Sequence, residues 1–455
     1  MSPAQLCEWL AREQHEFSER RPRSRALYAE GEQHYLYGAP LHWMRRWAGG
    51  FPLYAERASG ARLWCVDGFE YVDMCLGDTG AMTGHAAPAV TSAVSAQLQR
   101  GATLMLPTRD AAWVGAELTR RFGLPYWGFT TSASDANRAA IRIARLITGR
   151  DRVLVFNGCY HGSVEEAHVG LAGGRMVMRS GVHANAVEHE RVSRVVEFND
   201  LPALESALRE GDVALVLAEP CMTNYGLIEA QPGFLTALRG LTRRTGTLLL
   251  YDETHTWSAG PGGYTGRDHL DPDLFTIGKA IGGGVPVGLY GVSGEVAARL
   301  WEHAPRESDR PGVRQSSHLG FGGTLAGSAL QVAAVRAVLS QVLTAENFAR
   351  MIALADELGR RCRSVVSKCG LPWFIAQSGA RVETLLTPRA PRNASELART
   401  RDGTLETLLH LYMLNRGVLI TPFHSMLLMC PDTTAADLER YIGVFEGLCR
   451  ELTGR

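Results

Sequence analysis

The chain has 455 residues and a mass of 49.6 kDa, which at roughly 100–200 residues per domain predicts two or three domains. Hydrophobic residues make up 45% of it and charged residues 21%, shares near the globular average that exclude disorder of the chain as a whole. The 47 basic and 47 acidic residues give a formal net charge of zero, so we expect no nucleic-acid partner bound through bulk basicity.

The first part of the chain predicts a helix and then a small hairpin. Residues 1–50 begin with a helical pattern and lead into a segment rich in Gly, Pro and Trp, GAPLHWMRRWAGGFP. Residues 53–71 alternate polar and apolar side chains, which predicts a hairpin that turns at Ser59-Gly60 and at Asp67-Gly68. Helical periodicity follows over 89–100, 111–122 and 136–146, the last directly after a Ser-Ala-Ser-Asp turn that can cap a helix.

Short, fully apolar runs then recur between amphipathic helices, at residues 153–156, 213–218, 247–251 and 274–277. Such runs are typical of a parallel sheet buried on both faces. A long helix is predicted over 325–343, and a strand near 418–421. We therefore predict an α/β fold with two domains. A large domain over 75–330 holds a mostly parallel sheet flanked by helices, and a smaller α+β domain is built from 1–74 and 331–455.

Polar residues follow each apolar run directly. Because the carboxyl ends of parallel strands meet at one edge of a sheet, we expect these side chains to converge there. They are Glu219, Asp252, Lys279, and the pair Tyr160 and His161. The segment 130–135 adds hydroxyls and backbone amides at a helix start, an arrangement suited to a phosphate dianion.

Lysine is rare in this chain, because Lys279 and Lys368 are the only lysines among its 47 basic residues. Arginine cannot lose its proton to become a nucleophile, whereas lysine can. Lys279 lies in TIGKAIGGG at the predicted sheet edge, and Lys368 lies near the end of an ordinary helix. Lys279 is therefore the candidate for a required amine.

Four common catalytic or nucleotide-binding motifs are excluded. A P-loop requires Gly five residues before its Gly-Lys and a hydroxyl residue after it, but Asp273 and Ala280 stand there. The stretch GPGGYTG has Thr265 where a dinucleotide fold needs its third glycine. Neither G-x-S-x-G nor H-E-x-x-H occurs, and we expect no metal ion.

A lysine, a carboxylate, an aromatic ring and an anion-binding helix start are together what pyridoxal 5′-phosphate (PLP) requires. The chain resembles the class III aminotransferases of PLP fold type I, and among them the glutamate-1-semialdehyde aminomutases and β-phenylalanine aminotransferases. The resemblance rests on motifs that span roughly residues 63–335 in order: VDGFEYVDM, GHAAPAV, SASDANRAAIRIARLITGR, GCYHG, LAEP, LLLYDE, TIGKAIGGGVPVG and GGTLAGSALQVAA.

The resemblance implies a role for each candidate residue. Lys279 would form the Schiff base with PLP and then move the substrate proton, Asp252 would bond the pyridine nitrogen, and Tyr160 would cover the ring. The remaining residues implied near the cofactor, outside its phosphate, are His161, Glu219 and His255.

The phosphate would be held at the helix start, by Ser132, Ala133 and Ser134. Thr324 would reach the phosphate of the neighbouring subunit, so the resemblance implies a homodimer with shared active sites. A simpler alternative for Thr324 is a cap of the helix that follows it.

Substrate contacts are implied for the segment 76–85, LGDTGAMTGH, where Asp78 and Thr79 replace a Ser-Trp pair of the mutases. Near the C-terminus, LITPFHSMLLMC has His424 in a region where relatives carry a glutamate or an arginine. Arg45 or Arg46, in HWMRRWAGG, is a candidate clamp for a substrate carboxylate, and a solvated arginine is the alternative.

We predict a PLP-dependent aminotransferase that moves an amino group from an amine or amino acid to a keto or aldehyde acceptor through Lys279. The alternatives are an aminomutase or an amino acid racemase on the same fold, and a non-catalytic descendant that binds PLP or a protein. The nine cysteines are scattered, with no C-x-x-C pair, and no apolar run reaches the roughly 18 residues of a membrane span. We therefore expect a cytoplasmic enzyme without membrane contact.

Overall fold

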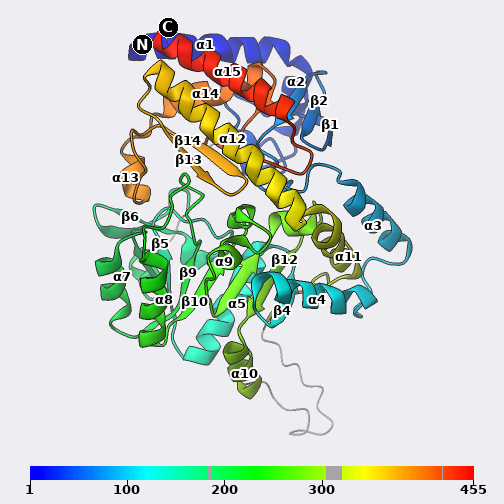
Figure 1. Ribbon diagram of the computed structural model, residues 1–455, viewed down its shortest axis with the longest axis vertical. Coiled ribbons are helices and arrows are strands. Elements are labelled where there is room, and N and C mark those ends of the chain that lie inside the picture. Colours follow the sequence, from blue (N-terminus) through cyan, green and yellow to red (C-terminus); the bar gives the residue numbers. More distant parts are fainter. Residues whose placement is uncertain (183–185, 304–319, 423, 455) are drawn as a thin grey trace. The chain divides into compact units, whose positions relative to one another are not determined.

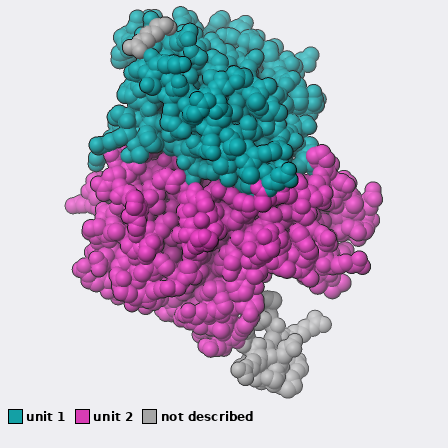
Figure 2. Space-filling model, viewed as in Figure 1, with its two compact units in different colours: residues 1–87, 346–390, 398–455 teal, residues 88–345, 391–397 magenta. Residues whose placement is uncertain are grey.

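The computed structural model describes residues 1–182, 186–303, 320–422 and 424–454. It divides into two compact units (Figure 2). Unit 1 consists of residues 1–87, 346–390 and 398–455, and unit 2 of residues 88–345 and 391–397. Each unit is described by itself below. In the described part of the chain, no helix is long and apolar enough to cross a membrane.

Unit 2 is built around a seven-stranded sheet with the order β4-β12-β11-β10-β9-β5-β8. Its strands are β4 (Tyr126–Thr130), β5 (Arg152–Phe156), β8 (Ser193–Val196), β9 (Val213–Ala218), β10 (Leu248–Asp252), β11 (Leu274–Ile277) and β12 (Gly288–Val292). Strand β12 runs antiparallel to both its neighbours, β11 and β4, and the other neighbouring pairs are parallel. The four predicted apolar runs form the central strands β5, β9, β10 and β11, which confirms the mostly parallel α/β sheet.

Helices flank this sheet (Figure 1). They are α3 (Pro88–Gln99), α4 (Arg109–Phe122), α5 (Ala133–Thr148), α6 (Ala186–His189), α7 (Leu201–Leu208), α8 (Phe234–Thr245), α9 (Gly263–Arg267), α10 (Gly294–His303), α11 (Ala329–Ala337) and most of α13 (Ala394–Ala398). Single helical turns occur as η2 (Glu165–Ala167), η3 (Thr256–Ala259) and η4 (Lys279–Gly282), and a short hairpin as β6 (Val169–Ala172) and β7 (Arg175–Met178). The alanine- and isoleucine-rich face of α5 packs into the same core as β5 and β9.

Two helix predictions are wrong in their bounds. The helix predicted from residue 136 begins at Ala133, because the Ser132 side chain accepts the backbone N–H of Asp135 at 3.2 Å and caps the helix there. The helix predicted over 325–343 starts only at Ala329 and passes into a π-helical turn, η6 (Val338–Val342).

Unit 1 contains two smaller sheets, β1-β2-β3-β15 and β13-β14-β16. The strands are β1 (Ala55–Ser59), β2 (Arg62–Cys65), β3 (Glu70–Asp73), β13 (Phe374–Ser378), β14 (Arg381–Leu385), β15 (Val418–Leu419) and β16 (Met426–Leu428). Its helices are α1 (Pro3–Arg20), α2 (Pro22–Gly31), η1 (His42–Arg46), α12 (Ala345–Cys369), α14 (Gly403–Asn415) and α15 (Ala435–Thr453). The hairpin turns predicted at Gly60 and Gly68 are present, and both glycines have a positive φ.

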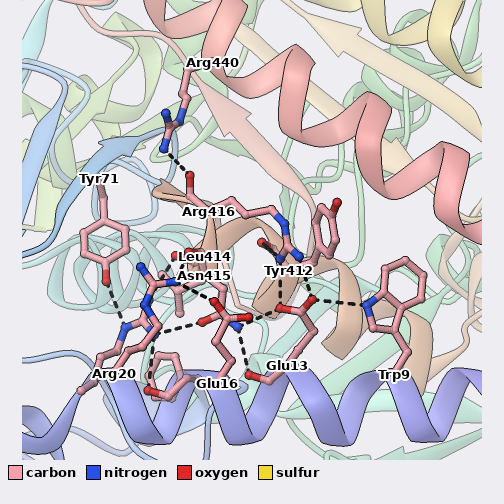
Figure 3. A network of polar contacts seen from close by, with 12 residues as sticks. Trp9, Glu13, Glu16, Arg20, Tyr71, Tyr412, Leu414, Asn415, Arg416 and Arg440 are labelled. Carbon is pink, nitrogen blue, oxygen red and sulfur yellow. Dashed lines mark hydrogen bonds and ion pairs between the residues drawn. The ribbon is translucent and has the colours of Figure 1, made fainter.

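A buried polar network joins α1 to the end of α14 within unit 1 (Figure 3). Glu13 of α1 is 4% exposed. Its carboxylate accepts two hydrogen bonds of 3.0 Å from Arg416, one of 2.8 Å from Asn415 and one of 3.3 Å from Trp9. Burial raises the pKa of Glu13, but these donors outweigh it and the net pKa is lowered. The N-terminal helix is thus attached to α14 by an ionised carboxylate.

Candidate active site

Asp252 ends β10 at the carboxyl edge of the large sheet and is 4% exposed. Its Oδ2 lies 2.9 Å from Nδ1 of His161 and accepts a hydrogen bond of 2.9 Å from Nδ2 of Asn137. Its Oδ1 accepts the backbone N–H of Thr254 at 3.1 Å. The carboxylate is therefore held by donors from three separate segments of unit 2.

The same donors keep Asp252 ionised. Burial raises its pKa, but the hydrogen bond and charge of His161, with the bonds from Thr254 and Asn137, lower the net pKa to about 2. The pKa of His161 is shifted in the opposite direction by the same two effects, burial and charged neighbours. Burial lowers the pKa of the imidazole, and the neighbouring Cys159 and Asp252 raise it to about 10. A buried anion of this kind suits a protonated pyridine nitrogen, which needs a negative partner.

Lys279 lies two residues beyond β11, at the first position of η4. Its backbone φ is 51°, a left-handed conformation that is strained for a residue with a side chain. Its Nζ lies 2.7 Å from Nε2 of His255. The predicted amine thus has a defined neighbour that can exchange a proton with it.

The start of α5 has the features of an anion site. Ala133 and Ser134 occupy its first turn, where backbone N–H groups have no acceptor within the helix. The Ser134 hydroxyl accepts the backbone N–H of Ser163 at 3.0 Å. Gly162 and Gly278 pack so closely here that an added Cβ would collide with Ser134 or lie 2.8 Å from the Cβ of Ala133. Glycine at these positions lets two loops close around the helix start.

Glu219 and Tyr160 are two further predicted residues of unit 2. Glu219 follows β9 and accepts hydrogen bonds from the hydroxyl and the backbone N–H of Thr223. Burial raises the pKa of Glu219 to about 7, although the charge of His161 and the bonds from Thr223 oppose the shift. The Tyr160 ring is half-buried, with the guanidinium carbon of Arg179 5.4 Å from its centroid.

Thr324 is exposed and precedes α11. The cap of α11 is Ser328, whose side chain accepts the backbone N–H of Gln331 at 3.3 Å. The capping alternative for Thr324 is therefore wrong. Its role toward a neighbouring subunit stays a prediction.

The predicted substrate residues lie in unit 1, and three of the four meet there. Nε2 of His424 lies 3.8 Å from Oδ1 of Asp78, and its Nδ1 lies 3.0 Å from Oε1 of Glu383. The Thr79 hydroxyl accepts a hydrogen bond of 2.9 Å from Arg381. Arg45 is exposed in η1, and within the described residues it makes no hydrogen bond or ion pair with this group.

Sequence reasoning missed three residues of these groups: Asn137, Arg381 and Glu383. Asn137 lies on the buried face of α5, where its neighbours are apolar. Arg381 and Glu383 alternate with apolar or small polar residues in RVETL, a pattern typical of a strand with one solvent face. The position of Asn137, shortly after the predicted phosphate-binding residues 132–134, was the signal that could have indicated a role at the site.

Comparison with known protein families gives a match to the model of Aminotransferase class-III over residues 43–437. Among curated relatives, a glutamate-1-semialdehyde 2,1-aminomutase 2 of Exiguobacterium sibiricum is 31% identical over 411 residues, which cover 88% of this chain and 90% of the relative. A glutamate-1-semialdehyde 2,1-aminomutase of Chloroflexus aggregans is 33% identical over 346 residues, covering 73% and 75%.

Solved structures match over nearly the whole chain. A glutamate-1-semialdehyde-aminomutase from Pseudomonas aeruginosa PAO1 has 51% sequence identity and a TM-score of 0.96, covering 99% of both chains. A β-phenylalanine aminotransferase from Variovorax paradoxus has 26% identity and a TM-score of 0.86, covering 99% of this chain and 98% of that one.

Proposed function

Because the chain belongs to the class III aminotransferase family, we propose that it is a PLP-dependent aminomutase, which moves an amino group between carbon atoms of one substrate molecule. The supporting observation is the 51% identity to the Pseudomonas aeruginosa glutamate-1-semialdehyde-aminomutase along 99% of both chains. The curated aminomutases add to it. These relatives favour the aminomutase over the aminotransferase, which was the main function predicted from the sequence.

The cofactor is pyridoxal phosphate, and the residues of unit 2 fit it. When bound, the cofactor supplies a carbonyl carbon for an amine and a pyridinium ring that withdraws electrons. We propose that the ionised Asp252 carboxylate faces the ring nitrogen and that the start of α5 receives the phosphate. The lowered pKa of Asp252 supports the first role, and the position of Ala133 and Ser134 in the first turn of α5, where N–H groups have no acceptor within the helix, supports the second.

Proton movement is proposed for Lys279. Its amine lies 2.7 Å from His255 Nε2, so the imidazole holds the side chain in place and can share a proton with it. His161 has a different role. Its Nδ1 is engaged by Asp252, so it positions the carboxylate and stays away from the proton transfer.

A second candidate is transfer between two molecules, as in an aminotransferase. The observation that favours it is the departure from the pattern that the resemblance implies for the mutases, because Asp78 and Thr79 replace the implied Ser-Trp pair. The fold similarity to the β-phenylalanine aminotransferase is consistent with it.

The two candidates differ in their need for an acceptor. Purified, PLP-loaded enzyme is incubated with a small vicinal amino aldehyde, glutamate 1-semialdehyde first, with no keto acid present. The aminomutase predicts isomerised product under these conditions. Turnover only after a keto acid or aldehyde is added would replace it with the aminotransferase. A visible cofactor band that no amine changes would contradict both.

A further inference from the structure

Arg179 lies at the end of the β6–β7 hairpin of unit 2, directly after Met178. Its side chain reaches the loop of residues 159–163, which we call the Tyr160 loop. Nη1 of Arg179 donates a hydrogen bond of 2.9 Å to the backbone oxygen of Cys159, and its guanidinium carbon lies 5.4 Å from the centroid of the Tyr160 ring. A cation within about 6 Å of a ring centroid is attracted to the ring, so two contacts with one loop position the guanidinium.

This loop also contacts both groups proposed to hold the cofactor. Nδ1 of His161 lies 2.9 Å from Oδ2 of Asp252, the proposed partner of the ring nitrogen. The backbone N–H of Ser163 donates to the Ser134 hydroxyl at 3.0 Å, at the proposed phosphate site. The guanidinium is thus attached to the loop at the residue next to the Asp252 contact, rather than at the residue next to the phosphate contact.

The donors of Arg179 are only partly used. Within the described residues, Arg179 forms no ion pair, and its Nε and Nη2 donate no hydrogen bond to another residue. The side chain is half-buried, and arginine remains protonated in proteins. Nε and Nη2 lie on one edge of the planar guanidinium, and two parallel N–H groups of this kind can bind both oxygens of a carboxylate. The chemistry of this edge therefore suits a carboxylate.

One carboxylate of the protein acts on the same region. At the imidazole of His168, burial lowers the pKa and the charge of Glu165 raises it, while the charge of Arg179 lowers it again. Within the part of the chain that the structure describes, Glu165 nevertheless forms no ion pair with Arg179. A carboxylate that reaches the guanidinium edge directly gains charge-assisted hydrogen bonds, which are roughly twice as strong as neutral ones. Glu165 therefore weakens the attraction for an anion without replacing it.

We propose that Arg179 binds the carboxylate of the substrate through Nε and Nη2, with the Tyr160 ring supporting the guanidinium. The substrate class is then an amine or amino aldehyde that carries a carboxylate, a group that glutamate 1-semialdehyde has. This inference rests on the proposed function and adds to it a residue that selects the substrate. The competing anion is the cofactor phosphate, which the start of α5 is proposed to receive, and cofactor retention distinguishes the two.

The test uses PLP-loaded enzyme and three primary amines of equal chain length: δ-aminovalerate, its carboxamide and pentylamine. The rate at which each amine removes the visible cofactor band is measured against amine concentration, which separates KM from the maximal rate. We expect wild-type enzyme to prefer δ-aminovalerate over pentylamine by about 10- to 100-fold in KM, the range of one hydrogen bond to a charged group. Arg179→Gln should lose most of this preference and leave pentylamine unchanged, whereas Glu165→Gln should increase the preference.

Valerate, which has no amine and cannot react, gives a readout that is independent of turnover. Calorimetry should show that valerate binds more weakly to Arg179→Gln than to wild type, by a similar factor. Arg179→Lys keeps the charge without the planar fork and should give an intermediate preference. The matched control is Arg175→Gln, at an exposed arginine of the same hairpin, which should react like wild type with every amine.

Three results would overturn the proposal: no preference for δ-aminovalerate in wild type, an unchanged preference in Arg179→Gln, or an equal loss on pentylamine in that variant. A fall in the cofactor content of Arg179→Gln on dialysis, with the preference for δ-aminovalerate intact, would assign the guanidinium to the cofactor phosphate instead. Failure of every amine to change the band of wild-type enzyme would contradict the proposed function.

Discussion

Nδ2 of Asn137 lies 2.9 Å from Oδ2 of Asp252, although the two residues are 115 positions apart. The Asn137 amide is oriented in turn by the Thr276 hydroxyl at 2.7 Å and by the backbone oxygen of His161 at 3.1 Å. Asn137 belongs to α5, whose first turn is the proposed phosphate site. One helix therefore carries the proposed phosphate site and orients the Asp252 carboxylate. In the proposed binding mode, a single rigid element thus positions both ends of the cofactor.

Asp252→Asn is expected to keep the fold and slow single turnover by at least about 100-fold, comparable to removal of a proton-transfer group, because a neutral amide is a poor partner for a pyridinium. Since the pKa of Asp252 is about 2, its ionisation should leave no step in the rate between about pH 5 and 9. Asp271→Asn, at an exposed carboxylate, is the control. Equal rates for both variants would show that Asp252 only stabilises a turn and is not the partner of the pyridinium nitrogen.

Lys279→Ala is expected to abolish turnover, with a loss of at least about 10²- to 10⁴-fold from proton transfer alone. PLP should stay partly bound through the groups at the start of α5. The chain offers a natural control, since Lys368, the one other lysine, is exposed on α12. Lys368→Ala should match wild type in rate and in cofactor content. Near-wild-type activity of Lys279→Ala would contradict the assignment of the amine.

Thr324→Val tests the proposed homodimer with shared sites. Loss of one hydrogen bond to a charged phosphate, about 1.5–3 kcal/mol, should weaken PLP retention on dialysis more than it lowers the melting temperature. Thr407→Val on α14 serves as control. Sedimentation that finds an active, PLP-loaded monomer at micromolar concentration would exclude the shared site.

Glu13→Gln is expected to lower the free energy of unfolding by about 1–3 kcal/mol, because Arg416 and Asn415 lose their anionic acceptor. The pKa of Glu13 is lowered in the folded chain. Its contribution is therefore fully present above the unfolded pKa of about 4.3 and is lost as the pH falls through the folded pKa. Urea unfolding at several pH values measures it.

The control for this variant is Glu16→Gln on the same helix. Glu16 is 42% exposed and pairs with Arg20, and exposed pairs contribute about 0–1 kcal/mol. A difference between wild type and Glu13→Gln that persisted unchanged at low pH would show that the carboxylate charge is not what stabilises α1.

The family and the α/β fold predicted from the sequence are confirmed. The prediction worked for the central strands because continuous apolar runs such as 213–218 carry their own signal, and because parallel strands bring the residues that follow them to one edge. Strand β12 gave no such signal, since its sequence GLYGV contains two glycines that pack against Ser132 and Trp127. Glu383 was hidden for the opposite reason: its alternating pattern resembles a strand with a solvent face, but tertiary packing buries both faces.

The attachment of Glu13 to Asn415, 402 positions later, sets an order for folding during translation. Helix α1 is synthesised before unit 2, and it finds Asn415 only after that residue has also been synthesised. The residues of unit 2 emerge in between. Their sheet can pair while α1 still lacks its contacts with α14, since domains generally fold as units during synthesis. A chain that stops before Asn415 leaves the Glu13 carboxylate without its donors, so the N-terminal helix of an incomplete product stays unpacked.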